Sequence, residues 1–131
     1  MSRPPGRPCV LVVDDEPLNR ELLGRLLGRE YEIEEAESVD QALAVLERRA
    51  ADVRLVICDQ VMPGRFGTEL AAEVARRYTA CPVVLLTGYE DDGAVRAAAA
   101  AGTVAGVVAK PWKGSELRAL ILGLLPPVPA G

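Results

Sequence analysis

Short apolar runs that alternate with segments of helical periodicity are the feature that most limits how this chain can fold. The clearest run covers residues 55–58, leads directly into Asp59 and is ended by the turn residues Met62, Pro63 and Gly64. An apolar run of this length, bounded by turn residues, is typical of a strand buried on both faces, as in a parallel sheet. An acid at the carboxyl end of such a strand lies at the edge of the sheet where ligands bind in open α/β folds.

The other runs extend this pattern along the chain. We expect strands at residues 9–13, 31–36, 55–59, 83–87 and 104–109, and helices at residues 17–28, 38–50, 66–78, 91–101 and from a cap at Ser115 to residue 125. The second strand alternates apolar and acidic residues, which predicts one solvent-exposed face and a position near an edge of the sheet. Together these elements predict a three-layer (βα)5 flavodoxin-like α/β fold, with a parallel five-stranded sheet and helices on both faces.

The domain organisation follows from the length and the composition of the two ends. A chain of 131 residues is long enough for one domain with a substantial core. We predict a flexible tail at residues 1–8, a single domain at residues 9–125 and a Pro-rich tail or start of a linker at residues 126–131. The Pro-rich ends favour a piece of a longer protein over a single-domain protein.

Composition excludes several classes of function. The net charge is −4, which argues against a general nucleic-acid or anionic-membrane surface. The chain has no histidine, which excludes a Ser/His/Asp triad and a histidine-bound zinc. Its three cysteines lack metal-ligand spacing, so buried thiols in a reducing compartment are expected. No segment resembles a membrane span or a signal peptide, and we expect a cytoplasmic protein.

Polar residues follow four of the five predicted strands. Asp14 and Asp15 follow the first strand, Asp59 the third, Thr87 the fourth and Lys110 the fifth. Each has an ordinary explanation when taken alone, such as a helix N-terminus for the acids or a surface position for the lysine. The carboxyl ends of parallel strands meet at one edge of a sheet, however, so these groups are expected to converge there.

Three converging carboxylates need a counter-charge. Two unit charges ~4 Å apart repel by about 4 kcal/mol at an effective dielectric of ~20. Lys110 supplies one positive charge, and Mg²⁺ with oxygen ligands fits the remainder. A carboxylate beside a divalent ion, a hydroxyl and an ammonium group is the arrangement that phosphoryl transfer to an aspartate requires.

Four short stretches of the sequence, in this order, resemble the response-regulator receiver domain of two-component signalling. They are Val12-Val13-Asp14-Asp15-Glu16, the stretch from Cys58 to Gly64 that contains Asp59, Leu86-Thr87-Gly88, and Lys110-Pro111. The resemblance covers residues 9–125. It implies that Asp59 is the phosphoacceptor, and that Asp14, Asp15, Asp59 and the backbone carbonyl of Val61 hold Mg²⁺, with Mn²⁺ as an alternative ion.

The resemblance also implies roles for the remaining residues. Thr87 would move toward the phosphoryl group, Lys110 would pair with it, and the bond from Lys110 to Pro111 would be cis. The family usually has a Tyr or Phe three residues before the lysine, where this chain has Val107. Tyr89 or Trp112 are the candidates to replace that aromatic residue in a conformational switch, although Trp112 is more simply explained as a packing residue.

The resemblance implies partners as well. The donor would be a histidine kinase or a histidine phosphotransfer protein, and the chain would catalyse only its own aspartyl phosphorylation and dephosphorylation. The conformational change would control an output domain in cis or a partner protein, and a homodimer through residues 91–125 is one possible assembly. No direct contact with nucleic acid or membrane is expected. The alternatives are a receiver-like interaction module that works without phosphorylation and, less favoured, a flavodoxin-like cofactor binder.

Overall fold

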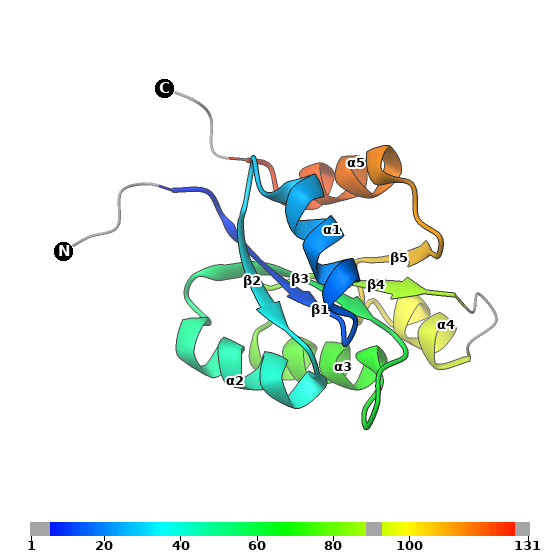
Figure 1. Ribbon diagram of the computed structural model, residues 1–131. Helices are drawn as coiled ribbons and strands as arrows, with labels where there is room; N and C mark the ends of the chain where they lie inside the picture. The colour runs from blue at the N-terminus through cyan, green and yellow to red at the C-terminus, as the bar shows by residue number, and fades with distance from the viewer. Residues whose placement is uncertain (1–5, 89–92, 128–131) are drawn as a thin grey trace.

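The structure is a computed structural model that describes residues 6–88 and 93–127. Ten helices and strands alternate along these residues (Figure 1). In chain order they are β1 (Cys9–Val13), α1 (Pro17–Leu27), β2 (Glu32–Ala36), α2 (Val39–Arg49), β3 (Val53–Asp59), α3 (Gly67–Arg77), β4 (Val83–Thr87), α4 (Gly93–Ala100), β5 (Gly106–Ala109) and α5 (Gly114–Leu124).

The strands form one parallel sheet in the order β2-β1-β3-β4-β5. Helices α1 and α5 cover one face of the sheet, and α2, α3 and α4 cover the other (Figure 1). A parallel strand can be reached only by a crossover, and right-handed crossovers send helices to opposite faces on either side of the starting strand. The predicted flavodoxin-like fold with five parallel strands in three layers is confirmed.

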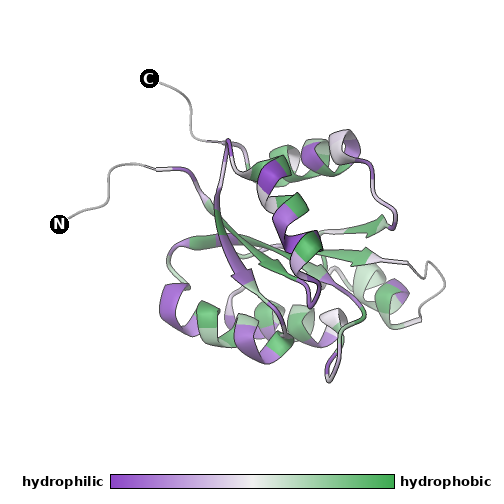
Figure 2. Ribbon diagram, viewed as in Figure 1, coloured by the Kyte–Doolittle hydropathy of each residue, from purple (hydrophilic) through white to green (hydrophobic). Residues whose placement is uncertain are grey.

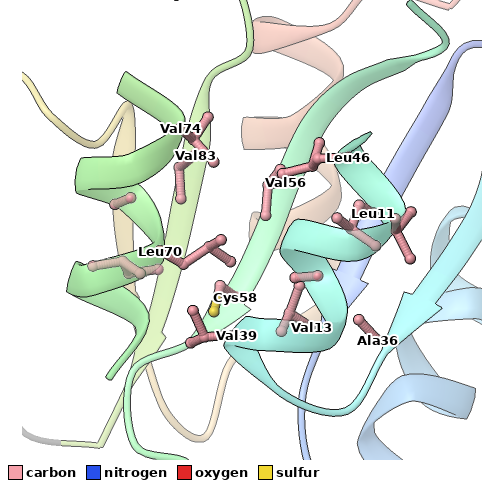
Figure 3. Packing of buried hydrophobic residues seen from close by; sticks show 14 of the residues in the cluster. Leu11, Val13, Ala36, Val39, Leu46, Val56, Cys58, Leu70, Val74 and Val83 are labelled. Atoms are coloured by element: carbon pink, nitrogen blue, oxygen red, sulfur yellow. The ribbon is translucent and has the colours of Figure 1, made fainter. Parts of the chain in front are cut away.

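Buried side chains form two cores, one on each face of the sheet. Successive side chains along a strand point to opposite faces. In β1, Leu11 and Val13 therefore join the core under α2 and α3 (Figure 3), whereas Val10 and Val12 join the core under α1 and α5. Apolar residues accordingly line the sheet and the inner faces of the helices, and polar residues face outward (Figure 2).

Strand β2 lies at the edge of the sheet, as its alternating pattern predicts. Two of its three acids are held by a single guanidinium group on α2. Arg49 pairs with Glu32 at 2.9 Å and with Glu34 at 2.7 Å, and these two carboxylates raise the pKa of Arg49. Charged side chains on an edge strand also discourage pairing with a second sheet.

Some predicted boundaries and burial patterns differ from the structure. Ser115 does not cap the last helix, because α5 already begins at Gly114 and its N-cap residue is Lys113. Strand β5 begins at Gly106 rather than at residue 104, and β2 begins one residue after Tyr31. Leu18 and Leu22 share the apolar pattern of α1 but are 62% and 42% exposed, since they lie beyond the width of the stripe that faces the sheet.

The Ala-rich helix α4 buries only one of its eight residues, Val95. Alanine side chains offer little surface to bury, so this helix has the smallest apolar anchor among the described helices. We therefore expect α4 to be the most weakly held of the described helices, with the fastest amide hydrogen exchange. Tyr89 and the first residues of the predicted helix lie outside the described part of the chain.

The cysteines are free thiols in the described structure, and the predicted burial holds for two of the three. Cys9 and Cys58 are buried, whereas Cys81 is half-buried. Burial raises the pKa of Cys9 and of Cys81 to about 11 and raises the pKa of Cys58 as well. Across the described residues, no helix has both the length and the apolar composition that a membrane span requires.

Candidate functional site

Three acids converge at the carboxyl ends of β1 and β3, as the sequence predicts. These strands are hydrogen-bonded neighbours, with Val13 opposite Cys58. Asp14 and Asp15 follow β1, Asp59 is the last residue of β3, and one carboxylate oxygen of each lies within 4.8 Å of the others. Asp14 and Asp59 are buried. Since three negative charges this close repel one another, the cluster requires positive charge in or beside it.

Lys110 supplies one of the positive charges. Its Nζ lies 2.7 Å from Asp59 Oδ1. The lysine directly follows β5, and its backbone N–H donates to the carbonyl oxygen of Thr87 at 2.8 Å. The peptide bond from Lys110 to Pro111 is cis, as the resemblance implies. One ammonium group balances one of the three carboxylates, so a divalent cation could balance the two negative charges that remain.

The side chain and backbone of Asp14 are held by the first turn of α1. Its Oδ1 accepts the backbone N–H of Glu16 at 2.9 Å, and its Oδ2 accepts the amide of Asn19 at 3.3 Å. Arg20 donates to the Asp14 carbonyl oxygen at 2.7 Å and pairs with Glu35 at 3.0 Å. Sequence reasoning missed Asn19 and Arg20. Their only signal is the position of two polar residues in the turn that follows the acids.

The environment of Asp14 disfavours its charged form. Burial raises the pKa of Asp14, and the negative charge of Asp59 raises it further. The N–H of Glu16, the charge of Lys110 and the amide of Asn19 act in the opposite direction, but the net shift is upward. A carboxylate held in this state gains from any nearby cation.

The backbone of Asp59 is contacted closely by the start of α3. A Cβ atom at Gly67 would lie 2.6 Å from the Asp59 carbonyl oxygen and 3.1 Å from Gln60 Cα. Only glycine permits this approach, because both neighbours are main-chain atoms that a side chain cannot displace. The residue at position 67 therefore determines how α3 seats against the strand that carries Asp59.

A Gly67→Ala variant is expected to lose roughly 2–3 kcal/mol of unfolding free energy in urea, because main-chain atoms must shift to admit the new methyl group. Gly123→Ala in α5 is the matched control. Its Cβ meets nothing within 4 Å, and alanine is the better helix former, so this variant is expected to gain up to about 1 kcal/mol. Equal unfolding midpoints for the two variants would show that the close contact at Gly67 does not matter.

Thr87 and Val107 lie together at the β4–β5 side of the site. Thr87 is buried at the end of β4. It lines a cavity of about 210 Å³ with Val107, Val95, Ala99 and residues 96 and 109. Val107 is 39% exposed and lies in β5 opposite Leu85. The valine thus leaves open space between α4 and β5 next to a candidate switch residue.

The remaining predicted residues that the structure describes are Trp112 and Val61. Trp112 is half-buried and packs against the core under α1 and α5, which supports the packing role. Val61 is 46% exposed in the loop after Asp59. Cavities of about 390, 380 and 440 Å³ lie at the opposite edge of the sheet, at the amino ends of the strands, and their linings include none of the three acids.

The donor set at the acids fits a hard divalent cation. Carboxylate and carbonyl oxygens are the ligands that Mg²⁺ and Mn²⁺ prefer, whereas zinc and copper favour nitrogen and sulfur. The cluster contains neither histidine nor cysteine. The three acids can therefore hold Mg²⁺ while leaving coordination positions for water or a phosphoryl oxygen.

Comparison with known proteins agrees with this site. Residues 10–122 match the model of the response regulator receiver domain. The hydrogenase transcriptional regulatory protein HoxA of Cupriavidus necator is 35% identical over 103 residues, which are 79% of this chain and 21% of HoxA. The transcriptional regulatory protein ResD of Bacillus subtilis is 36% identical over 117 residues, which are 88% of this chain and 47% of ResD. This chain thus spans less than half the length of either relative.

A solved structure shows the same likeness in three dimensions. The response regulator protein TrrA of Thermotoga maritima, crystallised in complex with Mg²⁺–BeF, is 36% identical with a TM-score of 0.77, and the alignment covers 89% of this chain and 98% of TrrA. The family match and these relatives together cover most of the chain. The chain therefore belongs to the response regulator receiver domains of two-component systems.

Proposed function

We propose that this receiver domain accepts a phosphoryl group on Asp59 in the presence of Mg²⁺ and that phosphorylation changes its conformation. The observation that carries the proposal is the convergence of Asp14, Asp15 and Asp59 within 4.8 Å, with Lys110 paired to Asp59 at 2.7 Å. Three acids and one lysine meet here at the carboxyl end of a parallel sheet, which is where open α/β folds bind their ligands.

The residues divide the chemistry among them. A carboxylate oxygen of Asp59 forms a bond to phosphorus as the bond from phosphorus to the donor breaks, which leaves an acyl phosphate on the protein. Asp14, Asp15, Asp59 and the carbonyl of Val61 would hold Mg²⁺, and the bound ion offsets charge on the carboxylates and on the transferring group. Lys110 is placed to move from the free carboxylate to a phosphoryl oxygen.

Thr87 is the proposed link between the site and the rest of the fold. Its hydroxyl group would donate to a phosphoryl oxygen, and its displacement would change the cavity that it shares with Val107 and α4. Helix α4 buries only Val95, with Ala98 partly buried against the same core, so it is the described helix most easily shifted. A ligand or modification acts on such an equilibrium only through its different affinity for the two states.

The partners follow from chemistry that the chain lacks. These 131 residues contain no histidine, so a phosphohistidine donor would lie outside them, on a histidine kinase or a phosphotransfer protein or domain. HoxA and ResD are transcriptional regulatory proteins by name and are more than twice as long as their matched regions. An output domain in cis, or a separate partner, is the proposed receiver of the signal, and self-association through α4, β5 and α5 is one form that the signal could take.

A second candidate function has one observation in its favour. Because residue 107 in β5 is a valine, the described structure has an open cavity beside Thr87. A large side chain at position 107 would fill this cavity and couple β5 to Thr87. A domain without that coupling would bind partners whether or not Asp59 is phosphorylated. Beryllofluoride with Mg²⁺ distinguishes the two functions, because only the switch predicts a change in oligomeric state or in backbone amide NMR spectra around α4.

Acetyl phosphate provides the test of the leading proposal. Incubation of the wild-type protein with acetyl phosphate and Mg²⁺ is expected to add a single phosphoryl group of about 80 Da by intact-mass measurement. The same incubation with EDTA in place of Mg²⁺ is the control and is expected to add none. Absence of the adduct in both samples would contradict phosphorylation at this site, whereas equal adducts in both would contradict the role of the metal.

A further inference from the structure

The loop between β3 and α3 is closed at its base by one glutamine and one threonine. Gln60 directly follows Asp59 and is buried. Its Oε1 accepts the backbone N–H of Thr68 at 2.8 Å, and its Nε2 donates to Thr68 Oγ1 at 3.3 Å. The backbone N–H of Gly67 also donates to the Gln60 carbonyl oxygen, at 2.9 Å. Residues 61–66 are thus held as a loop whose two ends are joined.

The backbone of Gln60 is fixed independently of this contact. Its N–H donates to the carbonyl oxygen of Leu86 at 2.9 Å, which extends the ladder between β3 and β4 by one residue. The side chain of Gln60 therefore acts from a rigid base, and what it restrains is the returning end of the loop. Both polar atoms of its amide are used on the same residue, so the contact sets direction as well as distance.

Part of this arrangement is a helix cap. The N-cap residue of α3 is Phe66, which has no side-chain oxygen to accept a first-turn N–H. The amide of Gln60 accepts one of those N–H groups from outside the helix. A purely structural role would end there, with an effect on the stability of the fold and none on the acids.

We propose that Gln60 and Thr68 are positioning residues that set the affinity of the acid cluster for its divalent cation. This inference rests on the proposed function, in which the Val61 carbonyl is a ligand. Val61 is the first residue of the closed loop, so the orientation of its peptide group depends on where Thr68 holds the loop. Mg²⁺ tolerates little deviation from octahedral geometry with ligands at ~2.0–2.1 Å, so a loop that is free to move binds it poorly.

The test measures metal affinity separately from stability. Gln60→Met removes both amide contacts, whereas Thr68→Val removes only the contact to Oγ1 and keeps the backbone N–H at residue 68; both variants keep similar volumes. Gln60→Met is expected to weaken Mn²⁺ binding, measured by electron paramagnetic resonance without any phosphoryl donor, by about 5–30-fold, and Thr68→Val is expected to weaken it by a smaller factor. Thr68→Ser keeps the hydroxyl group and is expected to bind as the wild type does. The double variant is expected to be little weaker than Gln60→Met alone, because that substitution already removes both contacts between the two residues.

Gln41→Met is the matched control. Gln41 also serves a helix N-terminus, since its Oε1 accepts the backbone N–H of Glu37 at 2.7 Å before α2. Its loss is expected to lower the urea midpoint without changing Mn²⁺ affinity. Unchanged affinity in both Gln60→Met and Thr68→Val would overturn the positioning role and leave only the cap. Failure of the wild type to bind Mn²⁺ would instead overturn the proposed function, and the positioning role with it.

Discussion

An Asp59→Asn variant is expected to gain no phosphoryl group from acetyl phosphate and Mg²⁺, under conditions in which the wild type gains one. Asparagine has nearly the shape of aspartate, and its side-chain oxygen can still accept from Lys110 Nζ, which lies 2.7 Å from Asp59 Oδ1. An amide oxygen is a far weaker nucleophile than a carboxylate oxygen, so the bond to phosphorus does not form. Intact-mass measurement over a time course checks this expectation.

Asp40→Asn is the control for that experiment. Asp40 is exposed in the first turn of α2 and pairs with Arg65 at 2.9 Å, so it is a carboxylate outside the acid cluster. The variant is expected to gain the adduct at the wild-type rate. A full adduct on Asp59→Asn would show that another residue accepts the group. A circular dichroism spectrum equal to that of the wild type would exclude unfolding as the reason for a missing adduct.

An Asp14→Asn variant is expected to be more stable than the wild type without metal and to bind Mg²⁺ about 100-fold more weakly or worse. Burial and the charge of Asp59 make the ionised form of Asp14 costly, and asparagine removes that charge. Its oxygen can still accept the Glu16 N–H, and its amide group can donate to Asn19 if the Asn19 amide turns over. A gain of about 1 kcal/mol would raise Tm by ~3–6 °C for a domain of this size.

The difference in stability between the wild type and Asp14→Asn is expected to depend on pH, because Asp14 titrates and asparagine does not. The pKa of Asp14 is raised in the folded protein above its ordinary value of 3.8. The stability that protonated Asp14 contributes is therefore fully present below pH 3.8, and it is lost as the pH rises through the folded pKa of Asp14. The wild type and Asp14→Asn are expected to have similar stability at low pH, and the variant is expected to become the more stable of the two as pH rises to neutrality.

Mg²⁺ is expected to reverse the order of stability, so that the wild type becomes more stable than Asp14→Asn. A ligand that binds only the folded state, at 100 times its Kd, adds about 2.7 kcal/mol to the unfolding free energy. Mg²⁺ is thus expected to raise the Tm of the wild type clearly and to leave that of Asp14→Asn nearly unchanged. Calorimetric unfolding with Mg²⁺ and with EDTA measures both effects. A variant that is less stable than the wild type in EDTA at neutral pH would contradict the cost assigned to the ionised Asp14.

Much of the fold is predictable from the sequence because buried parallel strands leave a strong signal. The continuous apolar run of β1 and the alternating pattern of β2 distinguish a central strand from an edge strand, and the sheet order confirms both. Prediction was wrong at the ends of elements. Ser115 is a good capping residue by type, yet α5 begins before it, at Gly114, with Lys113 as its N-cap residue. Local preference for a cap is small compared with packing of the helix on the sheet.

The candidate site also contains some residues that the sequence predicts and others that it does not. Asp14, Asp15, Asp59 and Lys110 could be found because strand ends are visible in the sequence and parallel strand ends share one edge. Asn19, Arg20 and Thr68 could not be found so, because polar residues in the first turn of a helix are common and usually face solvent. Their contacts with Asp14 and Gln60 depend on the angle at which α1 and α3 leave the sheet, and no local pattern encodes that angle.

The sequence by itself determined the order of strands and helices along the chain, which strands are buried on both faces, and which charged residues follow the strands. Each of these depends on the pattern of side chains within one segment. Only the tertiary structure decided that one carboxylate oxygen of each acid lies within 4.8 Å of the others, that Gly67 touches the Asp59 backbone, and that Gln60 and Thr68 close the loop beside them. These distances join residues from different elements, and they are set by how helices pack on a twisted sheet.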